Sequence, residues 1–267
     1  METVSPWGAY APNSKTYFLR FLTASGLGRG KMTKKIGCLW RRYQGERVDI
    51  EIRGVKYRLN LRDNVTDSKL LSSSKEHDRT ELNALKDACR GGVFVDAGSN
   101  IGYYSLALAV SGAASVLAIE PNPPTLARLR FNVKINGLDK IVTTVPTGIG
   151  PQGTSELFST GDLGSASLIK GSSDKKTSVT IQTRPLLDII RQQNLEKIDG
   201  MKIDVEGMED RALMPFFAAA PKSLWPACLV VEHCHKKDWQ TDIISHLLGT
   251  GYVLAGKTRS NTILKLR

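Results

Sequence analysis

The chain has 267 residues, of which 41% are hydrophobic and 24% are charged, a composition that excludes disordered, fibrous and collagen-like proteins. Its net charge of +11 is uneven, because residues 1–75 contain fifteen Lys and Arg against six Asp and Glu, whereas the rest is nearly neutral. No apolar run approaches the roughly 18 residues of a membrane span, and the first residues lack the apolar core of a signal peptide. We therefore expect a cytoplasmic protein with one α/β domain and a basic N-terminal extension.

The predicted extension comprises residues 1–90. Within it, residues 15–44 contain two short apolar and basic stretches broken at GLGRG, which predicts two short helices with a joint between them. Apolar and polar residues then alternate on both sides of Gly54, which predicts a β-hairpin, and residues 64–90 are predicted to be helical. A basic extension can contact RNA, an anionic membrane surface or an acidic substrate, or it can be a solvated surface without a partner, and the sequence leaves these alternatives open.

The remaining residues, 91–267, alternate between strand and helix patterns, which predicts a parallel sheet covered by helices. Residues 153–183 interrupt the alternation with the segments GTSELFS and TSVTIQT around a polar loop. We expect an inserted strand pair there, with a loop that reaches over a site at the edge of the sheet. The four cysteines, at positions 38, 89, 228 and 234, are scattered, so reduced thiols are expected instead of a disulfide framework.

The segment VFVDAGSNIGYYSLALA, residues 93–109, joins a buried strand to a helix through a D-x-G-x-x-x-G turn. A dinucleotide site instead has G-x-G-x-x-G, whose glycines admit a pyrophosphate, and the carboxylate of Asp96 disfavours such an anion at short range. S-adenosylmethionine fits better, because it has no phosphate and carries a sulfonium and an ammonium group. Glu120, at the end of the next strand, is expected to accept hydrogen bonds from two ribose hydroxyls, a role that would also serve NAD.

Three segments, FVDAGSNIGYYSLALA, AIEPNPPTLARLRFNVKING and MKIDVEGMED, resemble the FkbM family of S-adenosylmethionine-dependent methyltransferases. The similarity runs from about Val48 to the C-terminus. It implies a Rossmann-like class I fold, with a seven-stranded, mostly parallel sheet and one antiparallel strand. It also implies methyl transfer to a hydroxyl of a sugar, glycan, lipid or polyketide-like small molecule. The chain departs from the family at Ser99, where alanine is frequent, and in PTGIGPQG after the third strand.

Cofactor contacts are expected in the D-x-G-x-x-x-G turn, residues 96–102, which we call the glycine turn. Further contacts are expected after the second and third strands of residues 91–267, and at the end of the strand that contains MKID. In the turn, Gly98 and Gly102 would keep side chains away from the ligand. The expected cofactor-binding residues are Asp96, Gly98, Asn100, Gly102, Tyr103, Glu120, Pro121, Asn122, Thr147, Gly148 and Asp204.

Methyl transfer requires an aligned acceptor oxygen and a group that removes its proton. Period-two alternation places Lys202 and Asp204 on one face of a strand, with Glu206 just beyond its end and Glu232 at the end of the following strand. We expect the catalytic residues to be Asp204, Glu206 and Glu232, with Asp204 the first choice for the base. A grouping of Lys202 with Asp204 and Glu232 is similar to the lysine and acid cluster of ribose 2′-O-methyltransferases, which keeps RNA open as an acceptor. Glu209 is expected to be an acid at a helix N-terminus.

The segment EHCHKKD, residues 232–238, suggests a metal site, but zinc sites usually draw ligands from two separated clusters. We therefore expect no structural metal. A weakly bound Mg²⁺ among Asp204, Glu206 and Glu232 is left open, because oxygen ligands suit this ion. A non-catalytic binding module with the cofactor fold is a further alternative, and the sequence does not predict the acceptor or the oligomeric state.

Overall fold

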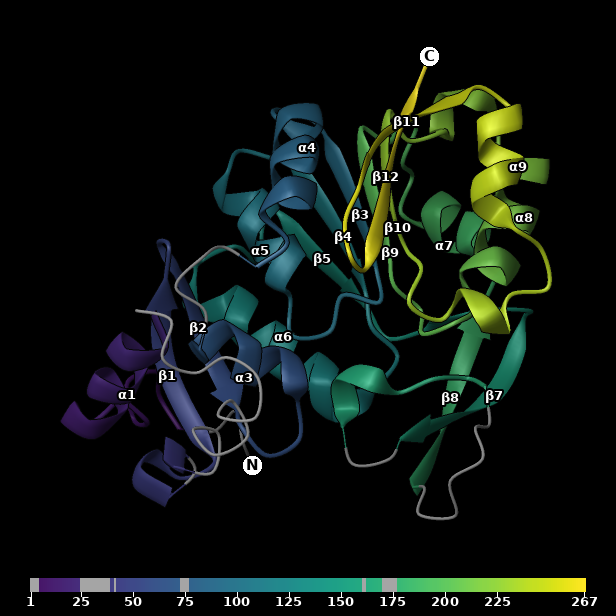
Figure 1. The fold of residues 1–267 in the computed structure, drawn as a ribbon. Helices are drawn as coiled ribbons and strands as arrows, with labels where there is room; N and C mark the ends of the chain where they lie inside the picture. The colour runs from purple at the N-terminus through teal and green to yellow at the C-terminus, as the bar shows by residue number, and fades with distance from the viewer. Residues whose placement is uncertain (1–4, 25–38, 41, 73–76, 160–161, 170–176) are drawn as a thin grey trace.

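The structure is a computed structural model, and it describes residues 5–24, 39–40, 42–72, 77–159, 162–169 and 177–267. Seven strands form the main sheet of this described part, in the order β11-β12-β10-β9-β3-β4-β5. Their bounds are β3 Val93–Ala97, β4 Ser115–Ile119, β5 Val142–Val145, β9 Gly200–Ile203, β10 Cys228–Glu232, β11 Tyr252–Lys257 and β12 Asn261–Leu266. β12 is antiparallel to both of its neighbours, whereas the adjacent pairs from β10 to β5 are parallel. The mostly parallel sheet with one antiparallel strand is thus confirmed (Figure 1).

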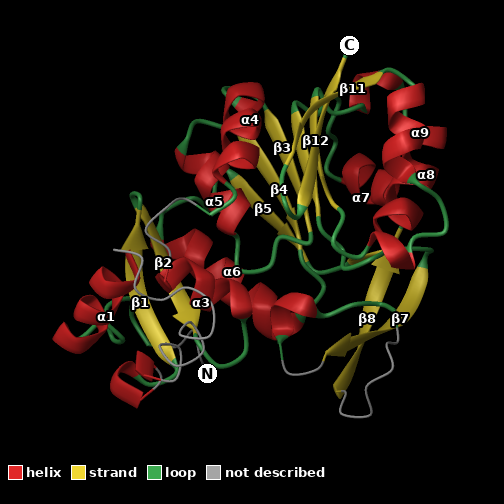
Figure 2. Ribbon diagram, in the orientation of Figure 1, coloured by secondary structure: helices red, strands yellow, loops and turns green. Residues whose placement is uncertain are grey.

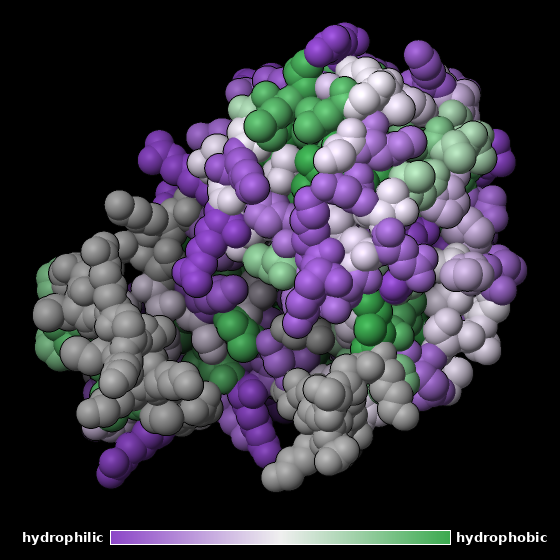
Figure 3. Space-filling view, turned by 45° about the vertical axis from the view of Figure 1, so that its right-hand side comes forward, coloured by the Kyte–Doolittle hydropathy of each residue, from purple (hydrophilic) through white to green (hydrophobic). Residues whose placement is uncertain are grey.

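Helices cover both faces of the main sheet (Figure 2). One face packs against α4 (Arg79–Cys89), α5 (Tyr103–Val110) and α6 (Pro123–Ile135), and the other against α7 (Leu186–Gln192), α8 (Glu209–Ala219) and α9 (Ile243–Gly249). Successive strand residues alternate between two hydrophobic cores, as Phe94 and Val95 do, because side chains of a strand point to opposite faces. Hydrophilic residues cover most of the coloured surface in Figure 3. In the described part of the chain, no helix is long and apolar enough to span a membrane.

The predicted hairpin is confirmed, with β1 (Arg47–Ile52) antiparallel to β2 (Val55–Asn60). Its turn is formed by Arg53 and Gly54, which both have positive φ, as the tight turns of hairpins require. Arg58 is fully buried, and its Nε lies 2.7 Å from Asp49 Oδ1. The backbone N–H of Arg58 donates to Asn132 Oδ1 of α6 at 2.8 Å. The hairpin therefore shares a packed interior with the helices of the main sheet.

The other helices of the N-terminal region agree only partly with prediction. α1 (Ser14–Ala24) matches the first predicted helix, residues 39–40 and 42–44 are helical, and the joint at GLGRG lies outside the described residues. Most of the described residues from 64 to 90 are helical, as predicted, but they form two separate helices, α3 (Val65–Ser72) and α4. Asp78, just before α4, has a left-handed backbone with φ of 50°, and a left-handed residue cannot continue an α-helix.

The inserted strand pair is confirmed as part of a second sheet, in which β7 (Gly153–Ser159) is antiparallel to β8 (Thr177–Arg184). The short strand β6 (Gly148–Ile149) pairs with β8 on its other side. Residues 162–169 of the intervening segment reach the start of α3. There the N–H of Leu163 donates to the Asp63 carbonyl at 2.7 Å, and the N–H of Val65 donates to the Asp162 carboxylate at 3.2 Å. The insertion and the N-terminal region therefore meet beside the carboxyl ends of the parallel strands of the main sheet.

Candidate active site

A cavity of about 310 Å³ lies at the carboxyl ends of β3, β4, β9 and β10. Ligands of open α/β sheets bind at this edge, where residues distant in sequence converge. Most of the predicted site residues line the cavity: Asp96, Gly98, Asn100, Tyr103, Glu120, Pro121, Thr147, Gly148, Asp204, Glu206 and Glu232. The predicted cofactor contacts Gly102 and Asn122 are not among the lining residues.

The two glycines of the turn have different structural roles. Gly98 has φ of +83°, and a Cβ there would overlap the carbonyl oxygen of Asp204, so the turn packs directly on the end of β9. Gly102 has φ of +93°, and a Cβ there would collide with Leu129 of α6. Gly102 therefore allows close packing of the start of α5 against α6 instead of forming the cavity wall.

Asp96 lines the cavity and also holds the first turn of α5 in place. Its Oδ2 accepts hydrogen bonds from the backbone N–H of Ser105 at 3.0 Å and from the Ser105 hydroxyl at 2.6 Å. The N–H groups of a first helical turn have no partner within the helix, so this carboxylate satisfies one of them. Burial raises the pKa of Asp96, and the Lys202 ammonium only partly offsets that effect. The sequence pattern did not predict that Ser105 holds the carboxylate of Asp96.

Glu120 connects the glycine turn to the start of α6. Its Oε2 accepts the backbone N–H of Asn100 at 2.8 Å, and its Oε1 accepts that of Asn122 at 2.9 Å. Asn122 therefore acts on the site through its backbone, as a support for Glu120. Burial raises the pKa of Glu120 to about 7, although both hydrogen bonds favour the ionised form. The carboxylate is thus fixed in position and titrates near neutral pH.

Lys202 and Asp204 form an ion pair at the end of β9, with Nζ and Oδ2 2.7 Å apart. The Lys202 side chain is buried, and its Nζ lies 4.9 Å from the centre of the Tyr104 ring. Burial lowers the pKa of Lys202, but Asp204 and Asp96 together raise it above its ordinary value. Lys202 is therefore an ammonium ion at neutral pH. The Asp204 side chain is 32% exposed, so it is accessible from the cavity.

Glu206 lies opposite His235 in the wall of the cavity, with Oε2 and Nδ1 3.3 Å apart. Its backbone is left-handed, with φ of 53°, which is a strained conformation for a glutamate. Its carbonyl oxygen accepts a hydrogen bond of 2.7 Å from the Ser167 hydroxyl of the insertion. Burial and the neighbouring carboxylates raise the pKa of Glu206 to about 9. Glu206 is thus a protonated acid at neutral pH.

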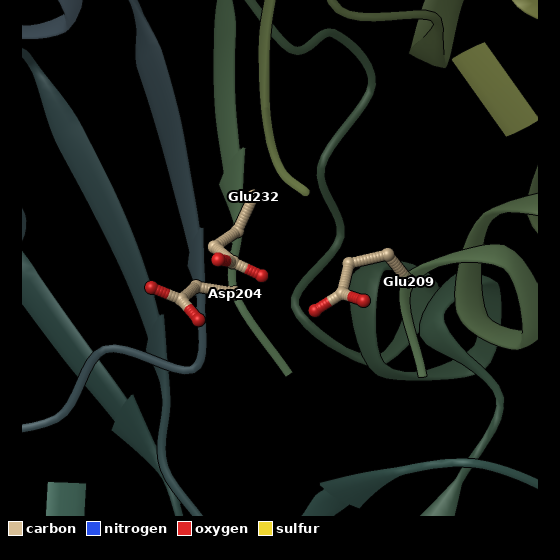
Figure 4. Close-up of side chains that lie close together, drawn as sticks. All are labelled: Asp204, Glu209 and Glu232. Carbon is tan, nitrogen blue, oxygen red and sulfur yellow. The ribbon is translucent and has the colours of Figure 1, made fainter. Parts of the chain in front are cut away.

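Two further glutamates lie beside Asp204 (Figure 4). Glu232 is 6% exposed, and its Oε1 accepts the backbone N–H of Cys234 at 2.7 Å. Glu209 is fully buried in the first turn of α8, where its Oε2 accepts a hydrogen bond of 2.7 Å from Trp239 Nε1. One oxygen from each of the three carboxylates lies within 4.8 Å of the other two.

Part of the cavity wall comes from residues of the N-terminal region and the insertion that were not among the predicted site residues. The N-terminal region contributes Val65, Thr66, Lys69, His77 and Asp78, and the insertion contributes Leu157, Asp162, Leu163, Gly164, Ala166 and Leu168. Asn64 Nδ2 donates to Asn100 Oδ1 at 2.7 Å, which ties the glycine turn to the start of α3. The segment DNVTDSKLLSSS, residues 63–74, which also resembles the family, could have pointed to Val65, Thr66 and Lys69.

The sheet order, the single antiparallel strand and the acid-lined cavity at the carboxyl edge define a class I, Rossmann-like methyltransferase fold. Residues 96–254 match the model of the methyltransferase FkbM domain, which covers more than half of the chain. The chain belongs to the FkbM methyltransferase family. Among curated protein sequences, none matches this chain.

Solved structures with a similar fold have low sequence identity to this chain. Trm5b from Pyrococcus abyssi is 14% identical, with 83% of this chain and 56% of that chain aligned and a TM-score of 0.45. TrmK from M. capricolum, in complex with S-adenosylhomocysteine, is 11% identical over 69% of this chain and 65% of that chain, with a TM-score of 0.41. An O-methyltransferase from Bacillus cereus, also with S-adenosylhomocysteine, is 12% identical over 72% and 83%, with a TM-score of 0.44. At these scores the likenesses say nothing of the substrate of this chain.

Proposed function

We propose that the protein transfers the methyl group of S-adenosylmethionine to a hydroxyl of a small molecule or glycan. The observation that carries this proposal is the placement of Asp96, Glu120 and Asp204 around one cavity beside the glycine turn. These carboxylates would repel a pyrophosphate, whereas they attract the sulfonium and ammonium groups of the methyl donor. Glu120 would bind the ribose hydroxyls, Asp96 and Asp204 the methionine end, and Thr147 and Gly148 the adenine.

When bound, S-adenosylmethionine supplies a methyl group that is activated by the sulfonium. The protein then has to align the acceptor oxygen and take its proton. Asp204 is the base in this proposal, because its side chain is accessible from the cavity and Lys202 holds one of its oxygens in place. Glu206 is a poor base, since its raised pKa keeps it protonated at neutral pH, but it can donate a hydrogen bond to the acceptor. Lys202 keeps its proton, which disfavours a lysine base.

The proposal is tested by calorimetric titration of the full chain with S-adenosylhomocysteine, with NAD as the control ligand. We expect binding of S-adenosylhomocysteine and no binding of NAD, because only NAD brings a pyrophosphate to Asp96. Binding of NAD instead, or of neither ligand, would contradict the assignment of the site.

The same titration should depend on pH through Glu120. Its pKa of about 7 in the free protein means that the carboxylate is largely protonated at pH 6 and largely ionised at pH 8. Ribose hydroxyls donate to the ionised form, so affinity should rise by about tenfold between pH 6 and pH 8. In Glu120→Gln, affinity should be low and this pH dependence absent. A pH dependence that persists in the variant would assign the titration to another group.

For the basic N-terminal region we infer contact with an anionic membrane surface. Residues 15–44 contain eight Lys and Arg and no Asp or Glu. On α1, Tyr17 and Phe18 are 55% and 61% exposed, on the side of the helix away from the buried Thr16 and Leu19. Aromatic side chains together with basic residues are typical of helices that lie on membranes. The inference would place the enzyme near lipid-linked acceptors.

Co-sedimentation with vesicles separates this partner from RNA, the alternative that the basic charge also allows. Binding is expected to vesicles that contain phosphatidylserine, to be weak to vesicles of phosphatidylcholine alone, and to fall in Phe18→Ser. Binding to RNA that weakens steeply with salt, without vesicle binding, would favour an RNA methyltransferase instead.

A further inference from the structure

The three carboxylates of Asp204, Glu209 and Glu232 lie at the edge of the cavity, and they come from the ends of β9 and β10 and from the start of α8 (Figure 4). One oxygen of each lies within 4.8 Å of the others. Oxygen ligands of one Ca²⁺ ion, each about 2.3–2.6 Å from the metal, lie at most about 5 Å apart, whereas those of one Mg²⁺ ion, at about 2.0–2.1 Å, lie at most about 4 Å apart. The spacing of these oxygens is therefore compatible with ligands of a single ion.

A second observation concerns Glu232 itself. Its side chain is 8% exposed, and its Oε2 has no hydrogen-bond donor in the described part of the chain. His235 Nδ1 lies 3.8 Å from this oxygen, which is too far for a hydrogen bond. The carboxylate of Glu232 points between Asp204 and Glu209 in Figure 4. A buried carboxylate oxygen without a donor is costly, so its position favours a ligand between the three acids.

The cationic side chains beside these three acids do not balance their negative charge. Asp204 is paired with Lys202, whereas Glu209 Oε1 accepts only backbone N–H groups, from Val205 at 2.9 Å and Gly207 at 3.3 Å. These neutral donors orient Glu209 without cancelling its charge. Each carboxylate oxygen accepts more than one bond, so none of these contacts prevents coordination of a metal.

We propose that Asp204, Glu209 and Glu232 bind a divalent cation that prefers oxygen ligands, such as Ca²⁺, Mn²⁺ or Mg²⁺. Asp204 and Glu232 line the cavity and Glu209 lies behind them, so the ion would lie at the wall where the acceptor binds. Its role rests on the proposed function: an acceptor hydroxyl bound to the ion would have a lowered pKa and would lose its proton more easily to the Asp204 oxygen that does not coordinate the ion. The site uses Glu209 where the sequence suggested Glu206, because Glu206 faces His235.

The test is a titration of the full chain with Mn²⁺ in the presence of saturating S-adenosylhomocysteine. Binding is measured as the loss of the electron paramagnetic resonance signal of free Mn²⁺. We expect one ion per chain, displaced by excess Mg²⁺, and an affinity at least about tenfold lower in Glu232→Gln. The matched control is Glu196→Gln, at an exposed glutamate remote from the cavity, which should bind Mn²⁺ like the unaltered chain.

Two further measurements keep the proposal falsifiable. If Glu232→Gln does not fold, Asp204→Asn replaces it, because its half-buried side chain tolerates the change better. S-adenosylhomocysteine binding in the presence of EDTA tests the cofactor site independently, so failure there is distinguished from failure of the metal site. No Mn²⁺ binding up to about 1 mM, the weak limit of protein calcium sites, would overturn the proposal, as would unchanged binding in both variants.

Discussion

Asp204→Asn is expected to lower kcat by roughly a hundredfold to ten-thousandfold, the usual contribution of a positioned general base. The amide keeps the shape of the side chain and can still accept the hydrogen bond from Lys202 Nζ, now 2.7 Å from Oδ2, but it cannot take a proton. Affinity for S-adenosylhomocysteine should fall only slightly, because the amide oxygen can still accept a hydrogen bond from the methionine end, and Asp96 and Glu120 retain their positions. The effect therefore falls mainly on turnover.

The measurement is release of S-adenosylhomocysteine in a coupled assay, with an acceptor that the unaltered chain methylates, alongside calorimetric binding of the same product. Glu196→Gln serves as the control for loss of one surface charge. Normal turnover in Asp204→Asn would contradict the assignment of Asp204 as the general base. Glu232 would then be the next residue to substitute. Loss of cofactor binding with unchanged kcat at saturation would instead assign Asp204 to the cofactor alone.

Gly98→Ala is expected to destabilise the fold by roughly 2–5 kcal/mol and to abolish S-adenosylhomocysteine binding. Two effects add at this position. The backbone has φ of +83°, which is unfavourable for alanine, and the new Cβ would overlap the Asp204 carbonyl oxygen. Relief of this overlap would move the glycine turn away from the end of β9 and separate Asp96 from Asp204.

Gly54→Ala is the matched control, because Gly54 has a similar φ of +77° but open space around its Cβ position. It should show only the backbone strain, as a smaller fall in the free energy of unfolding in urea, with binding retained. If Gly98→Ala is no less stable than Gly54→Ala and binds S-adenosylhomocysteine normally, the close packing of the turn against β9 does not constrain the site.

Local sequence patterns were sufficient for most of the fold. Strand and helix periodicities predicted the alternating elements from Val93 onward, the hairpin around Gly54 and the inserted strand pair, since each depends on residues close together in the chain. The division of the helical region 64–90 into two helices was not predicted, because an apolar periodicity does not reveal a left-handed residue such as Asp78. Gly102 and Asn122 lie outside the cavity wall because a motif gives the position of a turn and not the direction in which each residue faces.

The sequence by itself determined the methyltransferase class and the acids at the strand ends, because a strand–turn–helix motif is local and parallel strands bring their carboxyl ends to one edge. Only the tertiary structure decided what surrounds those acids. Ser105 holds Asp96, backbone N–H groups hold Glu120, and Glu209 joins Glu232 beside Asp204. These contacts, and the burial that raises the pKa of Glu120 and Glu206, depend on the packing of segments far apart in the chain.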